Sequence, residues 1–329
     1  MTMTQTRRRF LTMTALAGAA GLLSPERVRA AESALETTSV RLGRFSAICF
    51  APQYVCEALL RADGFTDVRY IDTTAVTSEE DLGRGKFDFQ SNLPMDHVIA
   101  IDRGLPITVL TGLHAGCYEL FAHEGIRGIA DLKGKRVGEG GSRWLSLIAA
   151  YVGLDPKKDL TLVDVIGANP LDLFAEGKLD AYMAAPPDVQ ELHAREVGHV
   201  ILRTATDPPW SQYFCCMTAA NREYAARYPV ATKRVIRAVL KAADLCASKP
   251  EVAARLIVDG GFTERYEYAL QTLTENPYGA WREYDAEDTL RFYALRMHEL
   301  GMIKSTPQKI IANGTDWRFL NEVKRELKA

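Results

Sequence analysis

The sequence predicts an α/β protein built from two related lobes that face each other across a cleft. Three observations lead to this prediction. The chain of 329 residues is long enough for two lobes that each bury a core of their own. Strand-like and helix-like segments alternate along most of the chain, and one stretch of this alternation occurs twice. Parallel βαβ units are the simplest arrangement for such an order of elements.

The repeat becomes visible when the chain is compared with itself at a shift of 92 residues. Nine positions between residues 63 and 103 are then identical to their counterparts. A period this long does not fit a solenoid, so two related lobes explain it more simply. A chance match between stretches with shared α/β patterning is the alternative. The identical pairs are Asp63/Asp155, Asp67/Asp159, Asp72/Asp164, Gly85/Gly177, Lys86/Lys178, Asp88/Asp180, Pro94/Pro186, Asp96/Asp188 and Arg103/Arg195.

Both copies are expected to contain the same elements in the same order. The first copy is predicted to have strands at 68–71, 86–90 and 107–110, and helices at 78–84 and from Pro94 to before Gly104. The second is predicted to have strands at 160–165, 179–183 and 200–202, and helices at 171–176 and from Pro187. After Tyr213 the pattern changes to long amphipathic helices, including segments near 285–300 and 317–327, which we expect to pack on the first lobe.

The duplicated strand-to-helix loops are candidates for opposing walls of the cleft. In parallel α/β sheets, ligands bind beyond the carboxyl ends of strands, where the first amides of helices are unpaired. The two loops are residues 90–94 and 183–187. Their candidate binding residues are Ser91, Asn92, Leu93, Ala185 and Pro186. The alternative is that both are ordinary capped loops, in which Asp96 and Asp188 stabilise the first turns of helices.

The first 30 residues are typical of a twin-arginine export signal. Arg7-Arg8-Arg9 precede a modest apolar stretch at 11–23, which is too short and too polar to remain as a membrane span, and the cleavage site Val28-Arg29-Ala30 contains no cysteine. An amphipathic helix that belongs to the fold is the alternative. Residues 1–30 contain five arginines and one glutamate, so their removal changes the net charge from −2 to −6. An acidic mature chain argues against nucleic acid or an anionic membrane as its partner.

The six cysteines do not have the regular spacing of a disulfide framework or of a zinc site. The chain has no CxxC or HExxH motif, so we expect no metal site, no cofactor and no catalytic residues. Most cysteines are expected to be buried thiols. Cys215 and Cys216 alternate along an expected strand, so their side chains should point to opposite faces.

Several motifs make the chain resemble the periplasmic solute-binding proteins of the family that includes nitrate, taurine, alkanesulfonate and thiamine-precursor receptors. The motifs are Pro52-Gln53-Tyr54-Val55, Gly85-Lys86-Phe87-Asp88-Phe89, the run from Gly128 to Gly138 with Asp131-Leu132-Lys133-Gly134-Lys135-Arg136-Val137, and Gly177-Lys178-Leu179-Asp180-Ala181. The resemblance implies a type II periplasmic binding protein fold with two hinge crossings. Lobe 1 would comprise residues 38–122 and 214–329, and lobe 2 residues 123–213.

The same resemblance implies binding without catalysis. A small organic solute, such as a sulfonate, a carboxylate or a heteroaromatic thiamine precursor, would be captured by closure of the cleft. The cargo would pass to the permease and ATPase of an ABC importer, and we expect a periplasmic monomer. One alternative is an enzyme of thiamine-pyrimidine biosynthesis from the same fold family, of whose cysteine-rich motif Cys215-Cys216 is only a partial echo. Another is a ligand-binding partner of a periplasmic sensor.

The resemblance also assigns contact loops by position. They match Phe50, Gln53 and Tyr54 after the first strand, then Ser91, Asn92 and Leu93, and then Gly141, Ser142, Arg143 and Trp144 in the second lobe. Chemistry supports the last loop, because glycines followed by a serine at a helix start expose amides and a hydroxyl that suit an anion. An ordinary glycine turn with Ser142 as N-cap is equally consistent. Arg143 could pair with an anionic ligand or point to solvent.

Aromatic residues near the expected cleft favour a ring or a short organic body over an inorganic ion. These are Phe50, Tyr54, Trp144, Trp210 and Tyr213, and packing in the core is the alternative for each of them. His114 follows a strand close to the first expected hinge at 117–121, where it could donate to a ligand or respond to pH. An incidental loop histidine is the alternative there.

Overall fold

Two five-stranded sheets carry the fold in the computed structural model, which describes residues 33–139, 143–163 and 169–328. Residues 35–329 form one compact unit. In the first sheet the order is β2 (Asp67–Asp72), β1 (Ser39–Arg44), β3 (Phe89–Asn92), β10 (Phe214–Asn221) and β4 (Ile107–Ala115). In the second sheet the order is β7 (Thr161–Val163), β6 (Arg136–Glu139), β8 (Ala181–Ala184), β5 (Glu119–Ala122) and β9 (His199–Arg203).

The duplication predicted from the sequence is present in this topology. Strands β3 and β8 begin and end 92 residues apart, and so do helices α4 (Ser78–Gly83) and α7 (Pro170–Ala175). In each sheet the fourth strand runs antiparallel to its neighbours, β10 in the first and β5 in the second. The two sheets are therefore copies of one plan, and we call the parts built on them lobe 1 and lobe 2.

Two predicted strands begin later than expected. The segments expected at 86–90 and 179–183 are strands at 89–92 and 181–184. Gly85 has φ +72° and Gly177 has φ +70°, a left-handed conformation that glycine adopts without strain. The residues after each glycine complete this turn, so the strand ladder starts only beyond them.

The aspartates of the two Gly-Lys-hydrophobic-Asp motifs hold each strand start in place. Asp88 accepts hydrogen bonds from the backbone N–H of Arg41 at 2.7 Å and from its guanidinium at 2.6 Å. Asp180 does the same for Arg136, at 2.7 and 2.9 Å. The repeated aspartate is thus explained by one clamp between neighbouring strands, which occurs once in each lobe.

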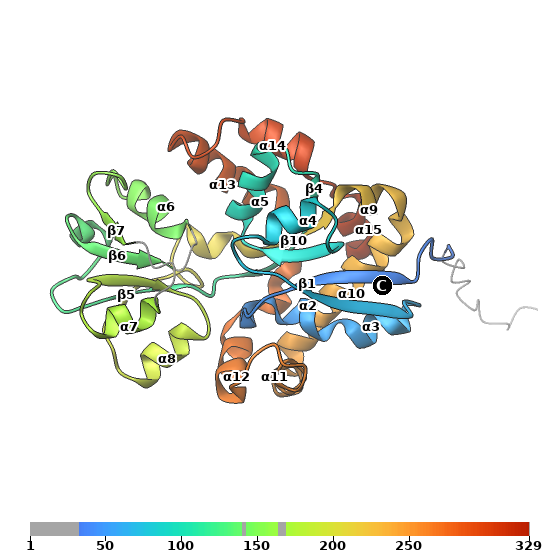
Figure 1. Ribbon diagram of the computed structural model, residues 1–329, viewed down its shortest axis with the longest axis horizontal. Coiled ribbons are helices and arrows are strands. Elements are labelled where there is room, and N and C mark those ends of the chain that lie inside the picture. The colour runs from blue at the N-terminus through green and yellow to red at the C-terminus, as the bar shows by residue number, and fades with distance from the viewer. Residues whose placement is uncertain (1–32, 140–142, 164–168, 329) are drawn as a thin grey trace, which may run out of the picture. The chain divides into compact units, whose positions relative to one another are not determined.

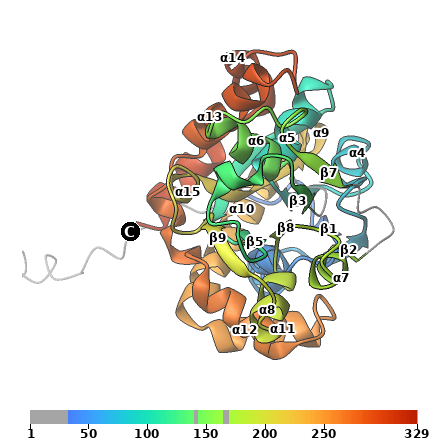
Figure 2. The ribbon, with the colours of Figure 1, turned by 90° about the vertical axis from the view of Figure 1, so that its left-hand side faces the viewer.

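Helices cover both faces of each sheet. In lobe 2, α6 lies on one face of the sheet while α7 and α8 lie on the other (Figures 1 and 2). In lobe 1, α2, α3 and α10 pack together, and α13 and α14 pack around α5 (Figure 1). The lobe 2 helices are η3 (Ile129–Leu132), α6 (Trp144–Tyr151), α7 and α8 (Asp188–Ala194), and η4 (Trp210–Gln212) lies before β10. The first helices of lobe 1 are η2 (Ile48–Phe50), α2 (Ala51–Val55), α3 (Glu57–Ala62), α4 and α5 (Pro94–Asp102).

The long helices after β10 belong to lobe 1, as the amphipathic pattern predicted. Ile236, Val239, Leu240 and Ala243 on α10 are all fully buried, because this face of the helix packs against α2, α3 and β4. The later helices are α9 (Arg222–Arg227), α10 (Pro229–Ser248), α11 (Pro250–Asp259), α12 (Tyr266–Glu275), η5 (Tyr278–Arg282), α13 (Ala286–Glu299), α14 (Pro307–Gly314) and α15 (Arg318–Glu326).

The chain passes from the first sheet to the second between Ala115 and Glu119, and it returns between Arg203 and Phe214. Strand β5 therefore belongs to lobe 2, whereas the predicted boundary at residue 122 would have placed it in lobe 1. The reason is that β5 inserts between β8 and β9, as β10 inserts between β3 and β4. The expected export signal at 1–30 lies outside the described residues. In the part of the chain that is described, no helix is long and apolar enough to cross a bilayer.

Candidate functional site

A cavity of about 560 Å³ is lined by residues of both lobes, and we call it the central cavity. Its size is within the usual range for small-molecule sites. Lobe 1 contributes most of the lining, and lobe 2 contributes Arg143, Ala185 and Pro186. The lobe 1 and crossing residues are Phe45, Ser46, Ala47, Cys49, Phe50, Ala75, Val76, Glu79, Glu80, Asn92, Leu93, Asp96, Ile99, Ala100, Arg103, Leu105 and Tyr118.

The walls of this cavity come from the ends of strands, as the topology requires. The segments that follow β1, β2 and β3 supply the lobe 1 wall, and Ala185 and Pro186 directly follow β8. Helix α5 begins at Pro94, where proline at the first helical position costs no hydrogen bond and fixes the turn. Leu93 precedes it in extended conformation and lines the cavity. The duplicated strand-to-helix loops therefore form two walls of one cavity.

An ion pair joins the lobes at this cavity. Arg143 Nη1 lies 2.6 Å from Asp96 Oδ1, and both residues line the cavity. Burial raises the pKa of Asp96 to about 6, although the positive charge of Arg143 opposes this rise. A carboxyl group with this pKa loses its proton between mildly acidic and neutral pH. The strength of its ion pair with Arg143 therefore changes over this range.

A network of polar side chains fixes the lobe 1 wall from behind. The amide of Asn92 donates to Glu79 Oε1 at 2.9 Å and to the hydroxyl of Ser78 at 3.2 Å. The imidazole of His97 lies 3.1 Å from the Glu79 carboxylate, and its Nε2 donates to the backbone oxygen of Met217 at 3.0 Å. Burial lowers the pKa of His97, but Glu79 outweighs this effect and the pKa is raised overall. The orientation of Asn92 is thus set before any ligand arrives.

Two further cavities adjoin the central one. A cavity of about 960 Å³ shares Phe45 and Ser46 with it, and a cavity of about 580 Å³ shares Tyr118 and Pro186. Eight of the eighteen residues that line the larger cavity are charged, and six of them form three ion pairs: Arg44 with Asp72, Arg195 with Asp172, and Arg265 with Glu191. A mostly apolar lining with a few polar groups is typical of ligand sites, so the central cavity is the better candidate.

Six of the residues predicted from the sequence line the central cavity, and they come from both lobes. They are Phe50, Asn92, Leu93, Arg143, Ala185 and Pro186. Gly141 and Ser142 lie outside the described residues. The other seven predicted residues are not part of this lining.

Three of these seven have structural roles in lobe 1. The amide of Gln53 donates to the backbone oxygen of Gly43 at 2.7 Å, and its oxygen accepts from the N–H of Ser91 at 2.6 Å. The Ser91 hydroxyl contacts that of Thr218. Tyr54 donates to the backbone oxygen of Phe45 at 2.6 Å and stacks on the ring of Phe262. These side chains hold the loops that carry the cavity wall, although they do not face the cavity.

The remaining four residues are packed away from the cavity. Trp144 and Trp210 are buried and meet edge to face, with ring centroids 5.6 Å apart. Tyr213 stacks on Phe292. His114 is fully buried at the end of β4. For the two tryptophans and Tyr213, core packing is what the structure favours over the predicted contact with a ligand, because large apolar surfaces are more stable away from water.

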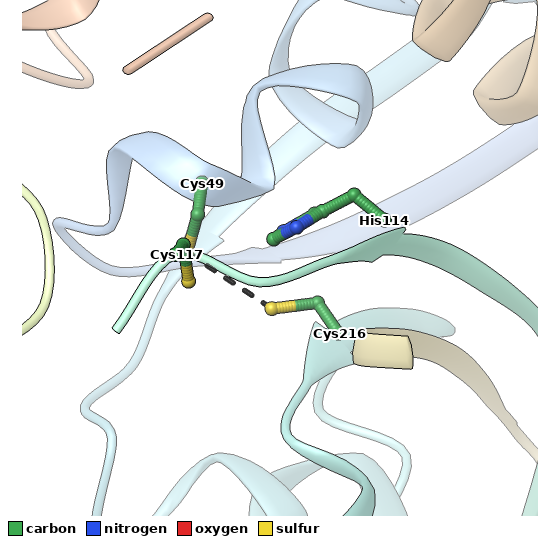
Figure 3. A group of neighbouring side chains, drawn as sticks. All are labelled: Cys49, His114, Cys117 and Cys216. Atoms are coloured by element: carbon green, nitrogen blue, oxygen red, sulfur yellow. Dashed lines mark hydrogen bonds between the residues drawn. The ribbon is translucent and has the colours of Figure 1, made fainter. Parts of the chain in front are cut away.

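Sequence reasoning missed several residues of the lining, including Phe45, Glu79, Asp96 and Tyr118. Asp96 carried a usable signal, since it is identical in the two copies, but it was interpreted only as stabilising a helix turn. A second group was also missed. Cys49, which lines the cavity, converges with His114, Cys117 and Cys216, and their arrangement could hold a metal ion (Figure 3). The only local signal was the spacing His114-x-x-Cys117.

Comparison with known proteins assigns the chain to a family. Among solved structures, the periplasmic nitrate-binding protein NrtA from Synechocystis PCC 6803 has a TM-score of 0.75 at 16% identity, with 90% of each chain covered. The alkanesulfonate-binding protein SsuA from Xanthomonas axonopodis pv. citri, bound to MOPS, has 0.70 at 17%, over 86% of this chain and 100% of that one. SsuA from Escherichia coli has 0.67 at 19%, over 83% and 91%.

These similarities establish the fold, which is that of the periplasmic binding proteins. No curated protein matches the chain. The family model described as NMT1/THI5 like matches residues 64–253, which is more than half of the sequence. The chain belongs to the NMT1/THI5-like family.

Proposed function

We propose that this protein is the solute-binding component of an ABC importer and captures a small organic molecule in the central cavity. The observation that carries the proposal is that Asn92 and Leu93 of lobe 1 and Ala185 and Pro186 of lobe 2 line the same cavity. A ligand that contacts both lobes stabilises the closed arrangement, because the shift in population equals its difference in affinity for the two states.

The lining favours an organic body over a bare inorganic ion. Phe45, Phe50, Leu93 and Tyr118 provide apolar and aromatic surface for a ring or a short chain. Three carboxylate residues line the cavity, Glu79, Glu80 and Asp96, against the two guanidinium groups of Arg103 and Arg143. This acidic surplus favours a heteroaromatic solute that donates hydrogen bonds over a sulfonate or a carboxylate, for which Arg143 would be the partner.

Export to the periplasm follows from the twin-arginine signal expected at residues 1–30 and is consistent with the similar solved structures that are named as periplasmic, NrtA from Synechocystis PCC 6803 and SsuA from Escherichia coli. The permease and ATPase would then receive the solute from the closed protein. Several similar solved structures are named as binding proteins, which supports capture without catalysis. A compound that is released unchanged after prolonged incubation would exclude the enzyme of thiamine-pyrimidine biosynthesis. Stabilisation by a compound that an intact importer does not take up would favour a sensor partner.

A stability screen over heteroaromatics, sulfonates and carboxylates tests the proposal. A true ligand at 100 times its dissociation constant should add about 2.7 kcal/mol to the free energy of unfolding. The variant Ala185→Trp places an indole in the cavity and should abolish this gain. Lys157→Trp adds the same side chain at an exposed position of lobe 2 and should keep it. Equal stabilisation of both variants by the same compound would show that the central cavity is not the site.

A further inference from the structure

Three cysteines and one histidine from three segments of the chain meet beside the central cavity, whose lining includes Cys49 (Figure 3). Cys49 comes from η2, His114 from the end of β4, Cys117 from the first crossing and Cys216 from β10. Their potential ligand atoms all lie within 4.8 Å of one another, and all four residues are buried. Apolar packing does not account for an imidazole among three thiols at this depth.

The imidazole of His114 is oriented as in a metal ligand. Its Nδ1 lies 3.2 Å from the backbone oxygen of Ala115, which can only accept, so Nδ1 carries the proton. Nε2 then presents a lone pair, is buried, and has no hydrogen-bond partner among the described residues. Leaving a buried acceptor without a partner is unfavourable, and a metal ion at Nε2 would remove this cost. Metal-binding histidines typically donate their other N–H to a backbone carbonyl in this way.

The spacing of the sulfur atoms is close to that of a tetrahedral zinc site. Zinc–thiolate bonds of about 2.3 Å in tetrahedral geometry place sulfur atoms about 3.8 Å apart. Cys49 Sγ and Cys216 Sγ are 4.0 Å apart. Small side-chain movements would therefore suffice to complete the coordination shell.

The backbone at Cys117 is strained, and this residue carries one of the four side chains of the cluster. Its φ is +131°, which is unfavourable for any residue with a Cβ, and it follows Gly116 with φ +69°. Such strain persists only where the surrounding structure imposes it. The strained residue is the one that carries the thiol of the crossing segment into the group.

We propose that Cys49, His114, Cys117 and Cys216 bind one zinc ion. Three thiolates and one imidazole fill a tetrahedral shell, so the site is structural and leaves no open position for a substrate. Three thiolates with Zn²⁺ carry a net charge of −1, whereas three thiolates with Cu⁺ would carry −2. Because burial of charge is costly, zinc suits this site better than copper. Zinc binding displaces the thiol protons. The ion would connect η2 and β10 of lobe 1 to the first crossing and so brace the segment between the lobes.

This site is independent of solute capture, because zinc would be held whether or not the central cavity is filled. The test uses the mature chain, purified under reducing conditions and loaded with zinc. Elemental analysis should give one zinc per chain, and X-ray absorption should show three sulfur ligands and one nitrogen ligand. Loaded protein should melt at higher temperature than protein treated with a chelator. With cobalt in place of zinc, thiolate charge-transfer absorption should appear.

Two variants and a matched control sharpen the test. Cys216→Ser and His114→Ala should each weaken zinc binding at least tenfold in competition with a chromogenic chelator, while Cys246→Ser should bind as the wild type does. Cys246 is an equally buried thiol of α10 outside the group.

Three results would overturn the proposal, and the first two need only the wild-type protein. The first is the lack of stoichiometric zinc in reduced protein. The second is zinc coordinated by nitrogen and oxygen alone. The third is a fully folded Cys216→Ser variant with unchanged affinity. A disulfide between Cys117 and Cys215, whose sulfur atoms are 3.3 Å apart, that persists in reductant would produce the first of these results.

Discussion

The two lobes share one strand order but bury their equivalent groups to different extents. The clamp between Arg41 and Asp88 in lobe 1 leaves 5% of the aspartate side chain exposed, whereas the clamp between Arg136 and Asp180 in lobe 2 leaves 29%. Most of the helices after β10 pack on lobe 1, although α12 also contacts α8 of lobe 2. A duplicated motif can therefore have the same geometry in both lobes and still contribute a different amount to the free energy of unfolding.

The lobes also differ where they face the cavity. Lobe 1 contributes polar and aromatic side chains there, such as Asn92 and Phe50, whereas lobe 2 contributes Arg143 and the small or rigid residues Ala185 and Pro186. The duplicated scaffold thus determines where a ligand can lie. The residues that differ between the copies determine the chemical class of ligand that the cavity can accept. Four predictions follow from this comparison.

The largest difference is expected at the two aspartate clamps. Asp88→Ala removes a nearly buried carboxylate that accepts from both the backbone N–H and the partly exposed guanidinium of Arg41, and should cost about 3 kcal/mol. Asp180→Ala should cost about 1 kcal/mol, because water can replace the lost carboxylate. Urea unfolding measures both values. Equal losses would show that burial does not distinguish the lobes.

The second difference concerns a glycine in the equivalent strands β1 and β6, each of which is second in the order of its sheet. A Cβ at Gly43 would overlap Oε1 of the buried Gln90 and would lie 2.9 Å from the ring of Phe87, whereas one at Gly138 would lie 2.5 Å from the flexible end of Leu179. Phe87 and Leu179 are equivalent positions of the repeat. Gly43→Ala should cost about 2 to 3 kcal/mol because both a buried amide and an aromatic ring would have to move, and Gly138→Ala about 1 kcal/mol. Thermal unfolding that ranked them in the opposite order would refute this explanation.

The third prediction concerns pH at the equivalent aspartates Asp96 and Asp188. Burial raises the pKa of both, to about 6 for Asp96. The folded state therefore keeps the proton of Asp96 between about pH 4 and 6, where the unfolded state has lost it, so Asp96 lowers stability as pH rises through this range. Asp96→Asn should reduce the loss of unfolding free energy from pH 4 to pH 7 by about 1 to 2 kcal/mol relative to wild type. An unchanged slope would mean that Asp96 has an ordinary pKa.

The smallest effect is expected at a second contact between the lobes. Glu191 accepts from Tyr268 at 2.6 Å and from Arg265 at 2.9 Å, and it is partly exposed. Exposed ion pairs contribute little, so Glu191→Gln should change stability by about 0.5 kcal/mol or less. The same substitution should leave ligand affinity nearly unchanged, which calorimetry can check. A tenfold loss of affinity would mean that the contact at Glu191, and not only the ion pair between Arg143 and Asp96, holds the lobes together around the ligand.

Most of the fold could be predicted because it depends on local patterns. The shift of 92 residues located β3, β8, α4 and α7 in equivalent places, and hydrophobic periodicity located α10. The predicted end of the first part of lobe 1, at residue 122, was too late, because the chain crosses to the second sheet before β5. Strand β10 likewise follows the return crossing and pairs in the first sheet. Such a crossing depends on pairing between distant segments, and no local pattern reports it.

The candidate site could be predicted only in part, for a related reason. Sequence order indicates which loops lie at the ends of strands, and this located Asn92, Leu93, Ala185 and Pro186. The direction of a large side chain depends on tertiary packing, so Trp144 and Trp210 pointed to a cleft that they do not line. The cluster of Cys49, His114, Cys117 and Cys216 could not be predicted from the sequence, because Cys49 and Cys216 meet only after the whole lobe has folded.

The central claim is that one solute lies between the two duplicated loops. A crystal structure of the protein with the most stabilising compound from the screen tests this most directly. The account predicts electron density for the compound in contact with both Asn92–Leu93 and Ala185–Pro186. Density that contacts only one lobe, or that lies in another cavity, would contradict it.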